Sequence, residues 1–533
     1  MSAILRAVLS MSAATGLSRI TGFVRTVVQA AILGTGVVAG AYTLSNTLPN
    51  QIFELFAGGL LSSVFVPILV ERLSRHGTED AHRLTDTLLT ILLPFLALVV
   101  LLGVVFAGPL IEATTAWTAS ESLSTEGAKQ TTDLAVLLFR VFAIQILFYG
   151  LISLSTGVLN SHRRFFLPTL APVLNNLVVV ASFSGYALLV PEHPATAVYL
   201  LASGTTFGVA AMAIILFPAV WRLGYRPRPR LGHPVLLPAA RLAGPMVIFV
   251  AAAVGIQVVA NYLGSRFDGV EKLWYAFTIF SLPYGVFVVS VATALMSELS
   301  ERHSRDDPAG YSENLSFGLR AMAFVVVPAS VGMAALAEPI VGLLYERGRF
   351  DAADTASVAT LLAAYSVGLL GYATYFVLVR ASYSRQNTRM PATLNVGLFL
   401  LYALLAYVLS EAMGLPGVAL AFSLAYTLCA LLCFAATRRQ LGRLDGHRLL
   451  RSLAKILAAG AAMYFAAQLG LVLLGPGSGV FDRALILTTA GGASLAAYLG
   501  AASLLRTEEL RLVVSLLRRR SAKGIAAAGE GDS

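Results

Sequence analysis

Charged residues are scarce in this sequence. Of its 533 residues only 12% are Asp, Glu, Lys or Arg, whereas 57% are hydrophobic. Soluble globular domains carry about 25% charged residues, so the composition excludes a soluble globular enzyme. No long polar block interrupts the apolar sequence, which also excludes a single-span protein with a large water-soluble domain. The composition is typical of an integral membrane protein with many spans.

Residues and motifs that carry out enzyme chemistry are also scarce. The 2 cysteines, Cys429 and Cys433, are spaced i, i+4 in an apolar run, which predicts core residues on one helix face rather than a redox or zinc site. All 7 histidines fall in predicted loops. The sequence has no H-E-x-x-H motif, no paired carboxylates within an apolar run and no G-x-x-x-x-G-K-[ST] phosphate loop. We therefore expect no enzyme activity, no metal site and no cofactor.

Apolar runs long enough to cross a bilayer, which takes about 20 residues, recur along the chain. The first run is not a removed signal peptide, because it continues past Arg19 and Arg25 without a small-residue cleavage site. The predicted fold is all-α, a polytopic membrane protein of about 14 transmembrane helices. These helices are expected at 7–34, 40–71, 85–111, 133–159, 167–190, 196–220, 238–263, 272–297, 317–337, 353–379, 390–410, 415–437, 452–475 and 484–505.

Positive charge is distributed unevenly among the loops between these runs. Most of the 38 Lys and Arg residues fall in alternate loops, while the longest of the other loops, between Glu112 and Asp133, is acidic. Because positive residues are retained on the cytoplasmic side, we expect both termini in the cytoplasm. The net charge of +10 follows from this topology and requires no nucleic-acid partner, although anionic membrane lipids also favour the same face.

Proline landmarks recur in the same order in two parts of the chain. Leu48-Pro49 matches Leu282-Pro283, and Pro94 matches Pro328. The order predicts two pseudo-symmetric six-helix lobes in the same orientation, followed by two extra helices. The expected divisions are an N-terminal lobe at 1–225, a C-terminal lobe at 226–445, the extra helices at 446–510 and a cytoplasmic tail at 511–533.

Arginines interrupt two of the apolar runs in the first lobe. An arginine at the bilayer centre costs at least ~2.5–3.5 kcal/mol, so it is retained where it faces a partner or a water-filled cavity. On an ideal helix Arg19 and Arg25 point about 120° apart and lie ~9 Å apart along the axis, so both can line one wide cavity. Arg140 lies nearer the outer end of its helix, and both snorkelling to the interface and a cavity role stay open.

One acid accompanies these arginines. Glu54 lies among apolar residues with Asn50 one helical turn before it. Either it pairs with an arginine or it acts in gating or ion coupling. No charge lies deep in a predicted span of the second lobe.

This asymmetry favours an anionic substrate group bound to the first lobe. Pyrophosphate is the natural candidate, since arginine offers its oxygens a planar fork of donors. An exporter of small cationic compounds on the same two-lobe plan is an alternative that a cationic cavity disfavours. A membrane-embedded transferase acting on polyprenyl phosphates is another, with Glu54 alone as its acid or base. Coupling to the membrane potential, to Na⁺ or to H⁺ stays open.

Several segments resemble one family. Residues 17–25 read LSRITGFVR, 48–50 read LPN, 56–69 read FAGGLLSSVFVPIL, 282–286 read LPYGV, 347–351 read RGRFD and 383–391 read YSRQNTRMP. Together they resemble the MurJ (MviN) lipid II flippase family of the MOP exporter superfamily, from about residue 5 to 505.

The resemblance implies a bacterial plasma-membrane protein that moves undecaprenyl-pyrophosphate-linked disaccharide-pentapeptide to the outer leaflet by alternating access, for cell-wall synthesis. It implies a pyrophosphate-binding role for Arg19 and Arg25, and a groove for the polyprenyl tail beside the two extra helices. The implied partners are this substrate, membrane lipids and proteins of cell-wall synthesis.

The sequence also departs from the family pattern. Gln51-Ile-Phe-Glu54 stands where many members have an arginine pair, Phe277 and Thr278 stand where they have Asp-Arg, and their acidic residue after helix 1 is replaced near Gly40. A different polyprenyl-linked glycan therefore stays an alternative substrate. Tyr275-Ala-Phe before LPYG resembles actinobacterial members; some of these have a large cytoplasmic extension, and here only a polar tail is expected.

Overall fold

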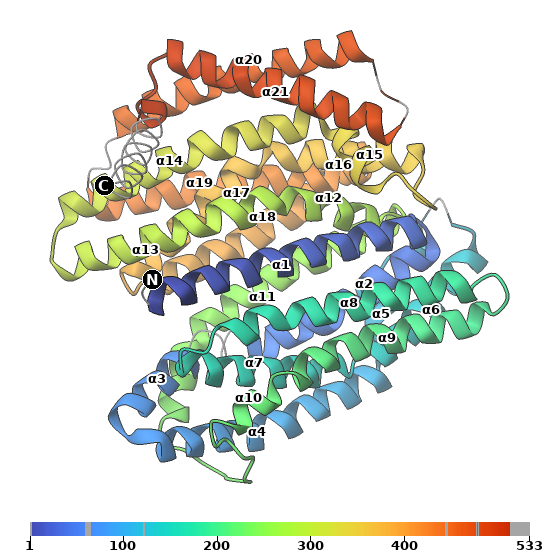
Figure 1. Cartoon of the computed structure of the whole chain (residues 1–533), viewed down its shortest axis with the longest axis vertical. Helices are drawn as coiled ribbons and strands as arrows, with labels where there is room; N and C mark the ends of the chain where they lie inside the picture. The colour runs from blue at the N-terminus through green and yellow to red at the C-terminus, as the bar shows by residue number, and fades with distance from the viewer. Residues whose placement is uncertain are drawn as a thin grey trace, which may run out of the picture. The chain divides into compact units, whose positions relative to one another are not determined.

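The computed structural model describes residues 3–58, 65–120, 123–442, 446–475, 477 and 479–511. Every regular element among these residues is a helix (Figure 1), which confirms the predicted all-α class. The predicted tail at 511–533 lies outside the described residues except for its first residue.

The described helices fall into two compact units. Unit 1 contains residues 1–275 and 345–354, and unit 2 contains 276–344 and 355–533. The elements from the first helix to α12 are α1 (Ala3–Leu33), α2 (Val37–Phe53), the π-helix η1 (Glu54–Gly58), α3 (Val66–Arg75), α4 (Gly77–Val105), α5 (Ala107–Thr114), the 3₁₀ turn η3 (Trp117–Ala119), α6 (Thr125–Phe142), α7 (Gln145–Ser161), α8 (Phe166–Leu189), α9 (Pro194–Ile214), α10 (Phe217–Trp221), α11 (Leu236–Arg266) and α12 (Val270–Pro283).

The remaining elements follow α12 along the chain. They are the π-helix η4 (Tyr284–Val288), α13 (Val289–Ser304), α14 (Pro308–Ala335), α15 (Ala337–Tyr345), α16 (Ala352–Val367), α17 (Leu369–Ser384), α18 (Arg389–Met413), α19 (Leu415–Leu441), α20 (Gly446–Leu474) and α21 (Val480–Leu504).

Eleven of the described helices are long and apolar enough to cross a membrane, or 12 if the bent pair α16 and α17 forms one span. The polytopic membrane fold is thus confirmed, with fewer qualifying spans than the 14 expected from sequence. The runs at 7–34 and 40–71 are the two that do not qualify. The first is the 31-residue α1, whose arginines and hydroxyls lower its hydropathy, and the second crosses residues 59–64, which are not described.

Unit 1 is held together by apolar and aromatic contacts between its helices. α1 packs on α8, α8 on α9, and α2 on both α6 and α7. Tyr42 of α2 is 2% exposed and meets the rings of Phe142 and Phe183 edge-on, at centroid distances of 5.6 and 5.3 Å. Its hydroxyl lies 3.1 Å from Oγ1 of Thr205 on α9, so its polar end is also satisfied.

In unit 2, α17 and α18 pack on α19, and α14 and α21 pack on α20. Cys429 and Cys433 are buried free thiols on α19, which confirms the prediction that they are core residues. Large apolar side chains of α20 instead point outward, such as Phe465 and Val472, which are 71% and 79% exposed. Such side chains are suited to lipid rather than to water.

Proline interrupts a helix at both Leu-Pro landmarks. Pro49 lies within α2, which runs into the π-helical turn of η1, and Pro283 ends α12, directly before the π-helical turn of η4. Proline removes a backbone donor and clashes with the preceding turn, and single π turns often accompany such interruptions. The two landmarks therefore have similar local structures, although the two-lobe division stays a prediction.

Candidate substrate-binding site

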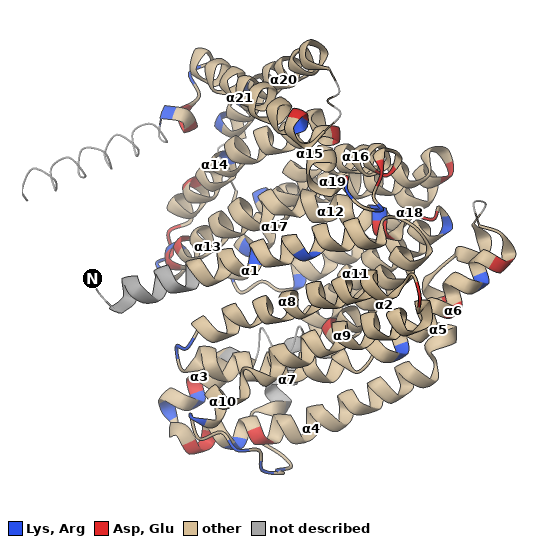
Figure 2. Ribbon diagram, turned by 45° about the vertical axis from the view of Figure 1, so that its right-hand side comes forward, with Lys and Arg blue, Asp and Glu red and all other residues tan. Residues whose placement is uncertain are grey.

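The arginines predicted to bind substrate lie on α1. Arg19 is exposed and Arg25 is half-buried. Among the described residues, neither guanidinium pairs with an Asp or Glu. Figure 2 shows positive but no negative residues on the coloured part of α1. Both arginines therefore stay candidates for binding an anionic ligand.

The packing of α1 on α8 determines the directions in which Arg19 and Arg25 point. Gly22 lies against α8, where a Cβ would come within 3.5 Å of Nδ2 of Asn176. The same Nδ2 donates to Oγ1 of Thr21 at 3.1 Å and to the carbonyl of Ser18 at 3.4 Å. These small and hydroxylated residues form the face of α1 that packs on α8. That contact fixes the rotation of α1 about its axis, and thus the directions of Arg19 and Arg25.

Polar side chains lie in the same part of unit 1 as Arg25. They include the phenols of Tyr42 in α2 and Tyr149 in α7. The Tyr149 hydroxyl donates to Oε1 of Gln145 at 3.1 Å, and Nε2 of Gln145 donates to Oγ1 of Thr206 at 3.4 Å. These neutral groups contribute hydrogen bonds without cancelling the positive charge.

The other predicted residues lie on different elements. Asn50 and Glu54 are exposed and one helical turn apart, and the backbone N–H of Glu54 donates to the carbonyl of Asn50. Within the described residues Glu54 forms no ion pair, so the predicted pairing with an arginine is not seen. Arg140 is exposed in the last turn of α6, which packs mainly on α2, α5 and α9 rather than on α1. The roles of these residues stay predictions.

The structure also shows an amide pair that sequence reasoning missed. Nε2 of Gln51 donates to Oε1 of Gln257 on α11 at 2.8 Å. Gln51 is 6% exposed, and its Oε1 has no partner. Gln257 and Asn261 interrupt an apolar run, which indicates in the sequence that this helix has a polar contact. The helix that it contacts is identified only by the tertiary structure.

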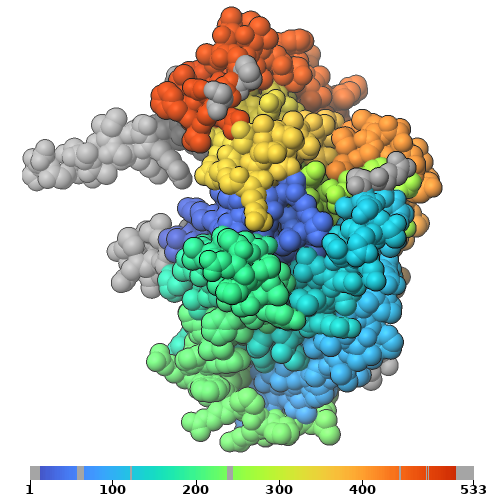
Figure 3. All heavy atoms as spheres, turned by 90° about the vertical axis from the view of Figure 1, so that its right-hand side faces the viewer, coloured from blue at the N-terminus to red at the C-terminus, as the bar shows by residue number. Residues whose placement is uncertain are grey.

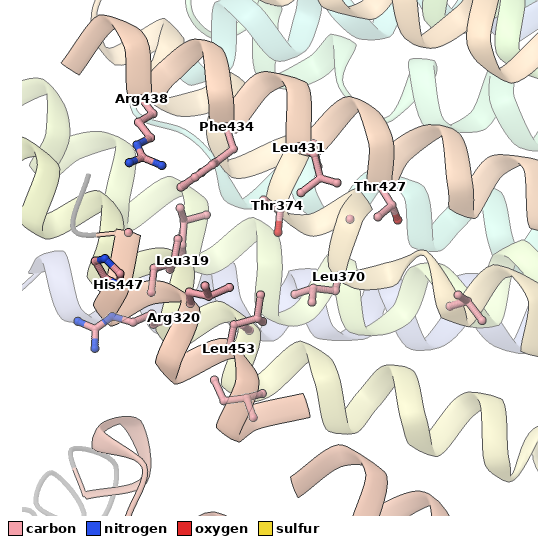
Figure 4. Close-up of a pocket in the computed structure, with 18 residues that line it drawn as sticks. Leu319, Arg320, Leu370, Thr374, Thr427, Leu431, Phe434, Arg438, His447 and Leu453 are labelled. Carbon is pink, nitrogen blue, oxygen red and sulfur yellow. The ribbon is translucent and has the colours of Figure 1, made fainter. Parts of the chain in front are cut away.

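A large cavity lies within unit 2. Its volume is about 940 Å³, and α14, α17, α19 and α20 line it. Figure 4 shows Arg320, Arg438 and His447 toward one end and Leu370 and Leu431 toward the other. A cavity of this volume with a mainly apolar lining suits an apolar or amphiphilic ligand.

An ionic network lies at the end of this cavity that Arg320 lines. Arg320, whose side chain is 7% exposed, donates from Nη1 to Oε2 of Glu508 at 2.9 Å and to Oε1 of Glu509 at 3.2 Å. Arg448 also donates to Glu508, and Ser452 donates to Glu509, each at 2.8 Å. Hydrogen bonds from Arg448 and Arg320 hold the pKa of Glu508 below its ordinary value. The residues after α21 are thus fixed to α14 and α20.

A protein-family model described as "Lipid II flippase MurJ" matches residues 29–480. The chain belongs to the MurJ lipid II flippase family. The family is one of transporters in the bacterial inner membrane, so the predicted flippase function in peptidoglycan synthesis, and the prediction that the chain is not an enzyme, are confirmed.

Two relatives show how far the likeness to the family extends. A Rhizobium meliloti protein described as a probable lipid II flippase MurJ is 30% identical over 542 residues, which cover 96% of each chain. A Burkholderia cenocepacia lipid II flippase MurJ is 29% identical over 443 residues, covering 82% of this chain and 84% of that one.

Solved structures confirm the fold. A MurJ lipid II flippase in an inward closed conformation matches with a TM-score of 0.75 at 24% identity, over 93% of this chain and 98% of that one. An inward-facing multidrug resistance MATE transporter of the MOP superfamily matches with a TM-score of 0.64 at 13% identity, over 83% of this chain and 99% of that one. At these identities the structural likeness concerns the fold alone.

Proposed function

We propose that this MurJ family member moves lipid II from the inner to the outer leaflet of the bacterial plasma membrane by alternating access, with both termini in the cytoplasm. The observation that carries the proposal is the pair of α1 arginines without a carboxylate partner among the described residues. Two guanidiniums at membrane depth can bind the pyrophosphate that joins the glycan to its lipid.

Arg19 and Arg25 play different parts in this binding. Arg19 is exposed and meets the pyrophosphate first, whereas Arg25 is half-buried beside Tyr42 and Tyr149 and holds it. Asn50 and Glu54 share an exposed face at the end of α2, where an amide and a carboxylate can hydrogen-bond sugar hydroxyls. Arg140 supplies a further positive charge on α6.

The polyprenyl tail is assigned to the cavity of unit 2. Its lining is mainly aliphatic and includes residues of α20, the first of the two helices beyond the proposed lobes. An isoprenoid chain in this cavity packs against its aliphatic lining. The divisions at 1–225, 226–445 and 446–510 and the actinobacterial affinity are part of the same proposal.

Growth rescue of a bacterium depleted of its own lipid II flippase tests these roles. The unmodified chain should restore growth. Arg25→Ala should abolish rescue at equal protein level, Arg19→Ala should weaken or abolish it, and Arg25→Lys should retain part of it, because lysine keeps the charge but loses the planar fork. Lys129→Ala removes an exposed charge elsewhere in unit 1 and should rescue fully. Full rescue by both alanine variants would contradict the assigned site.

The same assay examines the tail cavity with a matched pair on α19. Leu431 lines the cavity, whereas Leu424 is exposed on the same helix outside the lining. Leu431→Trp narrows the cavity and should weaken rescue, while Leu424→Trp should leave it unchanged. Equal rescue by the two variants would contradict the assignment of the polyprenyl tail to this cavity.

A further inference from the structure

Glu271, in the first turn of α12, is a buried acid that the proposed substrate site does not use. Its side chain is 2% exposed, and its Oε1 has no hydrogen-bond partner. The carboxyl accepts a hydrogen bond from its own backbone N–H. On the other side lies Gly40 of α2, where a Cβ would come within 3.0 Å of Oε2. The absence of a side chain at Gly40 therefore leaves the space that the carboxyl fills.

The charges that act on Glu271 are mostly negative. They come from Asp268 just before α12, Lys272 beside it and Asp354 at the end of the segment 345–354, and the phenol of Tyr275 also faces it. Within the described residues Lys272 forms no ion pair with Glu271. A buried carboxylate without a cationic partner is strongly disfavoured relative to its neutral form, and nearby carboxylates add repulsion. This arrangement therefore favours the protonated form of Glu271.

The segment 345–354 covers this part of unit 1. The backbone N–H of Arg349 donates to the carbonyl of Ala31 at 2.9 Å, and Thr35 Oγ1 donates to the carboxylate of Asp354. The rings of Tyr345 and Phe350 pack on Tyr275 with centroid distances of 5.4 and 5.9 Å. In Figure 3 this segment belongs to the part of the chain coloured yellow.

The Tyr275 hydroxyl connects the two features. Tyr275 lies one helical turn after Glu271 on α12, and its hydroxyl donates to the carbonyl of Gly34 at 3.2 Å. The segment 345–354 therefore reaches the surroundings of Glu271 through the rings that cover Tyr275 and through Asp354.

We propose that the Glu271 carboxyl is a proton-binding site that keeps the segment 345–354 seated on α1 and α2. When the segment detaches, the hydrated carboxyl ionises and its proton passes to water. When the segment reseats, the carboxylate takes one proton from water. The orientation is that of the proposed function, which places this end of α1 at the outer surface. A higher external pH should therefore favour the detached state, by up to about tenfold per pH unit for one proton.

Cysteine labelling from outside the cell tests this proposal without any lipid II. In a chain with Cys429 and Cys433 changed to Ser, Ala31→Cys places a reporter at a half-buried position of α1 that lies against the segment, since the Ala31 carbonyl accepts the Arg349 N–H. The labelling rate by an impermeant maleimide is divided by that of Thr118→Cys, an exposed position, to remove the pH dependence of the thiol itself. The ratio should rise between about pH 6 and about pH 8 in the parent.

Two isosteric variants decide the outcome. Glu271→Gln mimics the protonated acid, so its ratio should stay low at every pH. Glu112→Gln changes an exposed acid of α5 and should behave like the parent. A pH response that survives in Glu271→Gln, or a response to Na⁺ instead of pH, would overturn the proposal. If Glu271→Gln did not accumulate, Gly40→Ala should raise labelling at every pH by displacing the carboxyl, and unchanged labelling would overturn the proposal equally. A chain that shows the labelling response but fails to rescue growth would contradict the flippase assignment alone.

Discussion

Glu508 shows how a single residue secures the end of the described chain. It accepts hydrogen bonds from Arg448 and Arg320, which lower its pKa. Because the pKa is lower in the folded state, the stabilisation is present above the ordinary glutamate pKa of about 4.3 and is lost as the pH falls through the folded pKa. The side chain is 49% exposed, so solvent screening limits the size of the effect.

We therefore expect Glu508→Gln to lower the free energy of unfolding by ~0.2–1 kcal/mol at neutral pH and by almost nothing below about pH 3. Thermal unfolding of the purified protein in detergent at both pH values measures this. Glu313→Gln changes an exposed acid of α14 and should be neutral at both. A difference for Glu508→Gln that is equally large at both pH values would show that charge is not its cause.

Some functional residues could be predicted from the sequence and others could not. Arg19 and Arg25 are recognisable because a charge in an apolar run is costly wherever the helix lies. The Gln51–Gln257 pair and the Glu271–Gly40 contact depend on which helices meet, which local pattern does not specify. Glu271 also precedes the predicted span at 272–297, so the sequence placed it in a loop. The network of Arg320 with Glu508 and Glu509 was missed because its members lie far apart in the chain.

Among the elements, α17 and α19 approach unusually closely. A Cβ at Gly368, just before α17, would lie 2.3 Å from Cα of Ser423, and one at Gly371 would lie 2.6 Å from Cα of Thr427. Ser423 Oγ also donates to the carbonyl of Ala364 at 2.7 Å. Small residues here let the two backbones meet, as is common between membrane helices.

We predict that Gly368→Ala destabilises the protein by ~1–3 kcal/mol, because the overlap involves backbone that has no alternative rotamer. Gly397→Ala on α18 is the matched control, since nothing lies within 4 Å of its Cβ position. It should be neutral or stabilising by ~0.5–1 kcal/mol. Unfolding in detergent compares the two, and equal stability would mean that the helices can separate at no cost.

Element boundaries were harder to predict than element existence. Apolar runs identify helices such as α18 and α19 well, because length and hydropathy are local properties. The breaks between α6 and α7 and between α16 and α17 are not visible in hydropathy, since the runs continue across them. Such breaks arise from packing on neighbouring helices rather than from helix-breaking residues alone.

At the scale of the whole molecule, three observations support one account. The chain belongs to the MurJ family, α1 carries two arginines without a carboxylate partner among the described residues, and a mainly apolar cavity lies in unit 2. The chain is expected to carry a pyrophosphate on α1 and a lipid tail in unit 2 while the glycan crosses the membrane. In this account Arg19 and Arg25 bind the pyrophosphate without the arginines that many family members carry at the positions of Gln51–Glu54 and Thr278.

The most direct test measures lipid II in the outer leaflet. Cells depleted of their own flippase and expressing this chain are treated with an externally added enzyme that cleaves lipid II, and the cleaved fraction is quantified. The account predicts a large cleaved fraction for the unmodified chain and a background fraction for Arg25→Ala at equal protein level. A background fraction for the correctly inserted, unmodified chain would contradict the account.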